Sequence, residues 1–138
     1  MKSHARVVVI GGGVVGVSTL YHLAKKGWSD VVLVERKELT SGSTWHAAGL
    51  LPLFNMSYSV GQIHKYSVQC YQELEKETHM NVGFRNVSNI RLASNQDRMD
   101  EYRQYAGVAS TIGVEVDFLS PEQVLDYWPM CSVDGLVG

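Results

Sequence analysis

The chain has 138 residues, of which 45% are hydrophobic and 19% charged, and its formal net charge at pH 7 is −2. Length and composition are those of about one ordinary globular domain. The slight negative charge gives no electrostatic reason to expect nucleic acid or an anionic membrane as a partner. No apolar run approaches the roughly 20 residues that a membrane span needs, so we expect neither partner.

The first predicted element is a strand over residues 7–10, where valines and an isoleucine form a short continuous apolar run. Such a run is typical of a strand that is buried on both faces of a parallel sheet. Only residues 1–5 and Arg6 lie before this strand. This leaves no room for a presequence, so we expect a cytoplasmic protein, or one of the mitochondrial matrix if a presequence has been removed.

A glycine pattern follows this strand, with Gly11, Gly13 and Gly16 spaced as G-x-G-x-x-G. The first glycine permits a tight turn, the second lets the backbone approach a pyrophosphate, and the third allows close packing of helix on strand. The helix that begins here would direct its free N–H groups at the phosphates, with Val14 and Val15 also lining them. Its expected buried face, at helical spacing, consists of Val14, Val17, Leu20, Tyr21 and Ala24.

A second strand over residues 31–34 ends at Glu35, which lies 19 residues after Gly16. A ribose-binding acid belongs at about this position, because its carboxylate accepts hydrogen bonds from ribose hydroxyls. The carboxylate would repel a 2′-phosphate and so argues against NADP, although Arg36 beside it weakens that argument. The sequence therefore predicts a Rossmann-like dinucleotide-binding βαβ unit over residues 5–50. These features do not distinguish NAD from FAD.

The loop after the second strand is built from small residues around one histidine. Residues 42–44 offer amides and hydroxyls for a second contact with phosphate or ribitol. Residues 47–49 have almost no side chains, so a flat ring could lie against the backbone. From the residues alone, His46 is either a cofactor ligand or a loop histidine that bonds to a backbone carbonyl. We expect Trp45 to be a packing residue rather than a redox partner. The cofactor-binding residues expected here are Gly42, Ser43, Thr44, Trp45, His46, Ala47, Ala48, Gly49 and Leu50.

Three stretches resemble the N-terminal part of the dimethylglycine dehydrogenase and sarcosine dehydrogenase family, and the resemblance covers essentially the whole chain. The stretches are GGGVVGVSTLYHLAKKGW, VVLVERKELTSGSTWHAAGL and NIRLASNQDRMDEY. Members of this family are FAD-dependent amine oxidoreductases of the D-amino-acid-oxidase-like class. The resemblance implies FAD as cofactor, and it implies that His46 is bonded covalently to the 8α carbon of the flavin. Which ring nitrogen carries the flavin stays open.

The resemblance also implies an activity, which is hydride transfer from the N-methyl group of a small amine, dimethylglycine or sarcosine, to the flavin. Oxygen or an electron-transfer flavoprotein would accept the electrons, and tetrahydrofolate could bind in a C-terminal domain beyond this chain. We assign no catalytic residue and no metal site within the 138 residues. Two alternatives stay open: an amino-acid oxidase of the same fold that holds FAD without a bond, and a non-catalytic relative that acts as a regulatory subunit. His46 favours an amine oxidoreductase with covalently bound flavin over both of these alternatives.

Residues 51–138 are expected to form a helical and strand insertion, the start of a mixed α+β region that covers the substrate. We predict an amphipathic helix over residues 57–78, followed by paired strands over 82–94 with a turn near 86–89. A second helix over 96–112, capped by Asn95, and a strand over 113–119 come next. A short helix follows, with Ser120 and Gln123 in a capping box and Pro121 at its first position. The apolar end of the chain, SVDGLVG, reads as a strand that has been cut. We therefore interpret the chain as an incomplete, N-terminal fragment of a larger protein.

Overall fold

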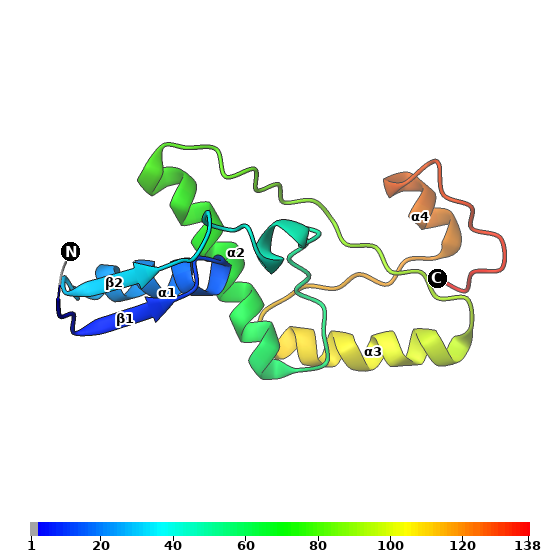
Figure 1. Cartoon of the computed structure of the whole chain (residues 1–138). Helices are drawn as coiled ribbons and strands as arrows, with labels where there is room; N and C mark the ends of the chain where they lie inside the picture. The colour runs from blue at the N-terminus through cyan, green and yellow to red at the C-terminus, as the bar shows by residue number, and fades with distance from the viewer. Residues whose placement is uncertain (1–2) are drawn as a thin grey trace. The chain divides into compact units, whose positions relative to one another are not determined.

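A computed structural model describes residues 3–138, which divide into two compact units, one ending at Leu50 and the other covering Leu51–Gly138. Figure 1 shows the elements in chain order. The first unit contains β1 (Val7–Ile10), α1 (Val14–Lys25), β2 (Val31–Val34) and a 3₁₀ turn (Ser43–His46). The second contains α2 (Tyr58–Thr78), α3 (Gln96–Thr111) and α4 (Pro121–Tyr127).

The first unit is a parallel βαβ unit, which confirms the predicted α/β, Rossmann-like class. β1 and β2 pair in parallel, with Val7 opposite Val31 and Ile10 opposite Val34. Exposure alternates along β1: Val7 is half-buried, whereas Val8 is 53% and Ile10 86% exposed. One face of the two-stranded sheet is therefore covered and the other is open. The expectation that β1 is buried on both faces is wrong for the described residues.

The buried face of α1 also differs from the expected one. An ideal Cβ at Gly16 would overlap the carbonyl oxygen of Gly11 and lie 3.5 Å from Cγ1 of Val9, so the helix touches β1 at this glycine. Leu20 and Leu23, at spacings of four and three residues, are half-buried on the same face. Close contact at Gly16 thus fixes the rotation of the helix. Of the residues that we expected to be buried, Leu20 and Tyr21 are half-buried and the exposed ones are Val14, Val17 and Ala24.

The three helices of the second unit all begin at a side-chain cap; the caps at Asn95 and Ser120 were predicted, whereas the cap at Ser57 was not. The side chain of Ser57 accepts a hydrogen bond from the amide of Val60 at the start of α2. Asn95 does the same for α3 through the amide of Arg98, at 2.8 Å. In α4 both halves of the capping box form between Ser120 and Gln123. Each cap satisfies amides that a helix N-terminus leaves without partners.

The predicted strands over residues 82–94 and 113–119 do not form, and this correction has a plain cause. A strand needs hydrogen bonds to a neighbouring strand, and the described chain provides almost none for these segments. Ala93 is the exception, because its amide donates to the carbonyl of Gly138 at 2.8 Å and its carbonyl accepts from the amide of Val137 at 2.8 Å. Within residues 51–138 the described structure is helical with extended connections.

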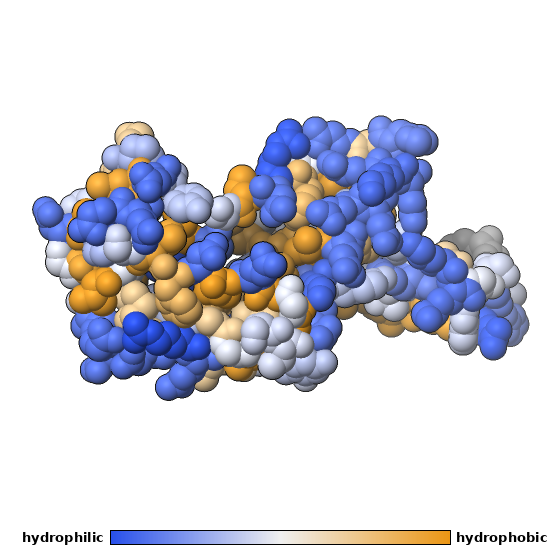
Figure 2. Space-filling model, turned by 180° about the vertical axis from the view of Figure 1, so that it is seen from behind, coloured by the Kyte–Doolittle hydropathy of each residue, from blue (hydrophilic) through white to orange (hydrophobic). Residues whose placement is uncertain are grey.

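The core of the second unit is small. Helices α2 and α3 approach each other at Gly61, whose ideal Cβ would lie 2.5 Å from Cδ1 of Ile112. Lys65 Nζ donates to the carbonyl of Ile112 at 2.6 Å, at the C-terminal end of α3. The buried hydrophobic residues are Ala93, Met99, Ala109, Ile112 and Val124. Many other large apolar side chains lie at the surface among polar ones (Figure 2).

None of the helices described for this chain combines the length and the apolar character needed to cross a membrane.

Candidate functional site

The glycine turn between β1 and α1 forms a cradle of backbone amides. Gly11 has a φ of +105°, in the region that favours glycine, and its amide donates to the carbonyl of Val34 at 2.8 Å. An ideal Cβ at Gly13 would lie 3.0 Å from Oγ1 of Thr44. Along the described chain, the amides of Gly13 and Val15 have no hydrogen-bond acceptor. Free amides at the positive end of a helix are suited to bind an anionic group such as a pyrophosphate.

Glu35 faces this turn and is held by two backbone amides. Its Oε2 accepts from the amide of Gly12 at 2.7 Å, and its Oε1 accepts from the amide of Lys37 at 2.9 Å. The hydrogen bond from Gly12, followed by that from Lys37, lowers the pKa of Glu35 below its ordinary value, with smaller contributions from the amide and charge of Arg36. Glu35 is therefore a fixed, ionised hydrogen-bond acceptor, as a ribose-binding acid must be.

Gly12 contributes to the turn although the sequence reasoning assigned it no role. It is the buried glycine of the turn, and an ideal Cβ there would lie 2.5 Å from Cδ2 of Leu39 and 3.1 Å from Cβ of Glu35. Its carbonyl accepts from the amide of Thr40 at 2.9 Å, and Thr40 itself has a φ of 65°. The signal for this role was the run of three consecutive glycines, since the middle one is not required by the G-x-G-x-x-G pattern.

The histidine loop is attached to the start of α1. Thr44, in the 3₁₀ turn, accepts a hydrogen bond through Oγ1 from the amide of Val14 at 2.9 Å. His46 lies two residues further along the same turn and is exposed. Along residues 3–138 its ring nitrogens have no hydrogen-bond partner, so the alternative of a histidine bonded to a backbone carbonyl is not observed. The turn therefore brings an exposed imidazole into the unit that carries the glycine turn.

Trp45 does not pack into a core in the described structure. Its side chain is 67% exposed, and its ring centroid lies 3.9 Å from that of His46, with an angle of 33° between the ring planes. Within this unit the contact described for the Trp45 ring is with His46, and its role as a packing residue rather than a redox partner stays a prediction.

Some of the predicted cofactor-binding residues are connected by hydrogen bonds in the structure, and others are not. Hydrogen bonds connect the glycine turn to Glu35 and to Thr44. The remaining loop residues share high exposure and have no described hydrogen bond to the glycine turn, although Gly49 adopts a φ of +72°. These are Gly42, Ser43, Ala47, Ala48, Gly49 and Leu50. Arg36 lies beside Glu35 on the chain and is exposed.

A dinucleotide fits this arrangement. Free amides at the start of α1 match a pyrophosphate, an ionised carboxylate matches ribose hydroxyls, and the glycines leave the space that a side chain would fill.

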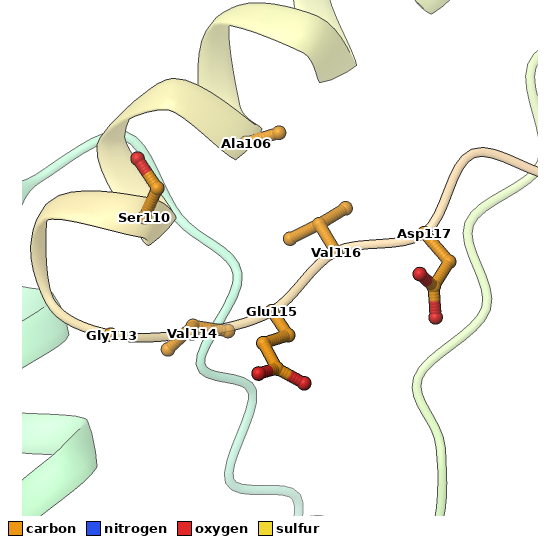
Figure 3. Close-up of a pocket in the computed structure, with 7 residues that line it drawn as sticks. All are labelled: Ala106, Ser110, Gly113, Val114, Glu115, Val116 and Asp117. Atoms are coloured by element: carbon orange, nitrogen blue, oxygen red, sulfur yellow. The ribbon is translucent and has the colours of Figure 1, made fainter.

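An open pocket of about 500 Å³ lies in the second unit, between α3 and the segment that follows it (Figure 3). Val116 points toward α3, whereas the carboxylates of Glu115 and Asp117 point away from it. Ala106, Ser110, Gly113 and Val114 complete its lining, which includes none of the predicted cofactor-binding residues. We assign this pocket no ligand.

Several curated proteins are similar to this chain over nearly its whole length. Dimethylglycine dehydrogenase of Rattus norvegicus, a mitochondrial protein, is 43% identical over 99% of the chain and 16% of its own length. Mitochondrial sarcosine dehydrogenase of Homo sapiens is 42% identical over 100% of the chain and 15% of its own. The mitochondrial pyruvate dehydrogenase phosphatase regulatory subunit of Mus musculus is 36% identical over 100% of the chain and 16% of its own length. The chain thus spans about one sixth of the length of these relatives.

Solved structures share the fold of the chain. The L-proline dehydrogenase from P. horikoshii matches 99% of the chain with a TM-score of 0.90 at 22% identity, over 36% of its own length. A glycine oxidase from Bacillus cereus matches 98% with a TM-score of 0.75 at 26% identity, over 38% of its own length. The family model described as FAD dependent oxidoreductase matches residues 6–138. The chain therefore belongs to the FAD-dependent oxidoreductase family.

Proposed function

We propose that this chain is the flavin-binding N-terminal part of an enzyme that oxidises the N-methyl group of a small amine, dimethylglycine or sarcosine. The observation that carries the proposal is the hydrogen bond between Thr44 Oγ1 and the amide of Val14 at 2.9 Å, because it ties the loop of His46 to the dinucleotide-binding turn. The proposal is supported by 42–43% identity to proteins named for the oxidation of these two amines.

The residues of the first unit would divide FAD between them. The amides of Gly13 and Val15 would bind the pyrophosphate, together with the turn at Gly11 and Gly16. Glu35, which is held as an anion by backbone amides, would accept hydrogen bonds from the ribose of the adenosine half. The loop over residues 42–50 would lie along the ribitol and the flavin, where its small side chains leave room for a flat ring.

His46 would carry the flavin covalently. Such a bond would replace one N–H of the imidazole and one C–H of the flavin 8α-methyl group. The two protons and two electrons released would pass to the flavin, and from it to dioxygen or another two-electron acceptor. An exposed imidazole without a hydrogen-bond partner along the described chain has a ring nitrogen free for this addition. When bound, FAD would supply the two-electron oxidation that the protein side chains cannot perform.

The tether is tested on the full-length protein by denaturation in acid, followed by detection of flavin fluorescence on the precipitated polypeptide. We expect the parent protein to keep its flavin, and His46→Ala to release it. His4→Ala is the matched control, because His4 is also exposed and its described hydrogen bond is to the neighbouring Ser3. Release of all flavin from the parent protein would refute the tether and favour an oxidase with non-covalent FAD.

The substrate is tested by measuring turnover of dimethylglycine, sarcosine and longer N-methyl amines with an artificial electron acceptor. Hydride loss from the N-methyl carbon leaves an iminium ion, and its hydrolysis yields formaldehyde and the demethylated amine. Binding of tetrahydrofolate is measured separately, by equilibrium binding to the full-length protein, because free formaldehyde condenses with tetrahydrofolate without an enzyme. Comparing oxygen with an electron-transfer flavoprotein as acceptor would identify the partner that removes the electrons.

A regulatory protein is the second candidate, because the chain is also 36% identical to the regulatory subunit of pyruvate dehydrogenase phosphatase. A full-length protein that turns over no amine and holds no acid-stable flavin would support this class. We propose a mitochondrial-matrix location for the full-length protein rather than a cytoplasmic one, which is supported by similarity to mitochondrial relatives. Import into isolated mitochondria tests this location.

A further inference from the structure

We propose that His64 and Arg91 are positioning residues, which anchor the C-terminal end of the loop over residues 42–50 through the carbonyls of Pro52 and Phe54. The inference rests on the proposed function and deepens it, because this loop is the part of the chain assigned to the ribitol and the flavin. It concerns how the loop is held at its far end, and not how the flavin is attached.

The first anchor comes from α2. His64 lies in the second turn of this helix, and its Nδ1 donates to the carbonyl of Pro52 at 2.6 Å in a partly buried contact. A carbonyl oxygen can only accept, so Nδ1 carries a proton whether the ring is neutral or charged. Because Pro52 precedes α2 by only a few residues, the bond folds the connecting segment back onto the helix that it leads into.

The second anchor comes from the extended segment before α3. Arg91 Nη2 donates to the carbonyl of Phe54 at 3.0 Å, and the Cζ of Arg91 lies 4.9 Å from the centroid of the Phe54 ring. The guanidinium therefore contacts both the backbone and the side chain of one residue. The centroid of the same ring lies 5.4 Å from that of Tyr105 and 6.0 Å from that of Tyr102, both in α3. Phe54 is thus held at its carbonyl and at its ring.

The two anchors act on a part of the chain that has few other contacts. The N-terminal end of the loop is bonded to α1 through Thr44, whereas residues 48–51 make no hydrogen bond within the described chain. A loop that is fixed at both ends samples fewer conformations than a loop that is fixed at one end. Less ordering is then required when a cofactor binds along the loop, which favours both binding and attachment.

A neighbouring residue shows what a purely structural contact of the same kind looks like. Lys65 follows His64 in α2, and its Nζ donates to the carbonyl of Ile112 at 2.6 Å, at the end of α3. That bond connects two helices, whereas the acceptors of His64 and Arg91 lie in a segment that is neither helix nor strand. Substitutions can therefore separate support of the helices from support of the loop.

Limited proteolysis of the full-length protein with chymotrypsin tests the anchors, because this protease cleaves after aromatic residues. The segment has to open before cleavage after Phe54, so the cleavage rate follows the population of the opened form. His64→Leu and Arg91→Met remove the two donors. His64→Asn keeps an N–H donor near the position of Nδ1, and Arg91→Lys keeps a charged donor. Lys65→Met is the matched control.

We expect cleavage after Phe54 to be about two- to tenfold faster in His64→Leu and in Arg91→Met, as loss of one hydrogen bond predicts. The two conservative variants and Lys65→Met should stay near the parental rate. Cleavage after Tyr105, inside α3, monitors unfolding of the unit and should not change in the anchor variants.

Flavin attachment provides the second measurement. Full-length protein produced without riboflavin is mixed with FAD, and the appearance of acid-stable flavin is followed over time. His64→Leu and Arg91→Met should both slow this step, because an unanchored loop has to be ordered first. His64→Asn and Arg91→Lys should restore most of the parental rate.

Parental cleavage after Phe54 in either His64→Leu or Arg91→Met would overturn the inference. The same acceleration in Lys65→Met, or faster cleavage after Tyr105 in the anchor variants, would show general destabilisation of the unit and also overturn it. Parental attachment rates in both anchor variants would remove the positioning role. A parent protein that forms no acid-stable flavin would refute the tether of the proposed function, whereas faster cleavage in both anchor variants would still support the anchors.

Discussion

Replacing Gly16 by alanine should destabilise the first unit in a way that the structure makes calculable. An ideal Cβ at this position would overlap the carbonyl oxygen of Gly11 and lie 3.0 Å from its carbonyl carbon. Overpacking of this kind costs about 1–3 kcal/mol, and the upper end applies because a backbone group, rather than a flexible side chain, has to move. Alanine recovers about 1 kcal/mol of helix propensity. The net loss should therefore be about 2 kcal/mol in the free energy of unfolding.

Gly107→Ala is the matched control, because Gly107 also lies inside a helix, α3, but its ideal Cβ would meet no atom within 4 Å. Here the propensity gain acts alone, so the substitution should stabilise the second unit by about 1 kcal/mol. Urea titrations of the full-length protein measure both changes in the free energy of unfolding. Flavin fluorescence reports on the first unit, and hydrogen exchange in α3 reports on the second. Equal stability of Gly16→Ala and the parent protein would refute the close helix–strand contact.

Two further predictions concern the groups that hold the site together. Hydrogen bonds from the amides of Gly12 and Lys37 lower the folded-state pKa of Glu35 below its ordinary value of 4.5. The ionised carboxylate therefore stabilises the fold fully above about pH 4.5. This stabilisation is lost as the pH falls through the lowered pKa. Glu35→Gln should therefore flatten the acid-side loss of stability in urea titrations over a pH series. The same acid slope in Glu35→Gln and in the parent protein would contradict this. Thr44→Val removes the acceptor of the Val14 amide and should cost about 1 kcal/mol of stability and weaken FAD binding, whereas Thr44→Ser should retain both. An unchanged dissociation constant for FAD in Thr44→Val would show that the loop is not held at α1 in solution.

Local chemistry made much of this fold predictable from the sequence. Ser57, Asn95 and Ser120 each cap a helix within three residues of themselves, so the starts of α2, α3 and α4 depend on neighbours along the chain. The glycine pattern and the acid after β2 likewise identified the parallel βαβ unit. The family was indicated by the resemblance of three longer stretches of sequence.

Features that depend on distant partners were not predictable. Residues 82–94 and 113–119 have alternating patterns, but no neighbouring strand lies beside them in the described chain, so they remain extended. The rotation of α1 is set by the contact of Gly16 with Gly11 and Val9 rather than by its own hydrophobic periodicity. The stacking of Trp45 on His46 depends on a 3₁₀ turn that no sequence pattern indicated.

The attachment of FAD to His46 is tested most directly by mass spectrometry of the trypsin-digested full-length protein. Cleavage after Lys37 and Lys65 releases a peptide that contains His46 and also His64. We predict that this peptide carries the mass of FAD less two hydrogen atoms, and that fragmentation assigns the added mass to His46. An unmodified peptide, or flavin on His64, would contradict the account.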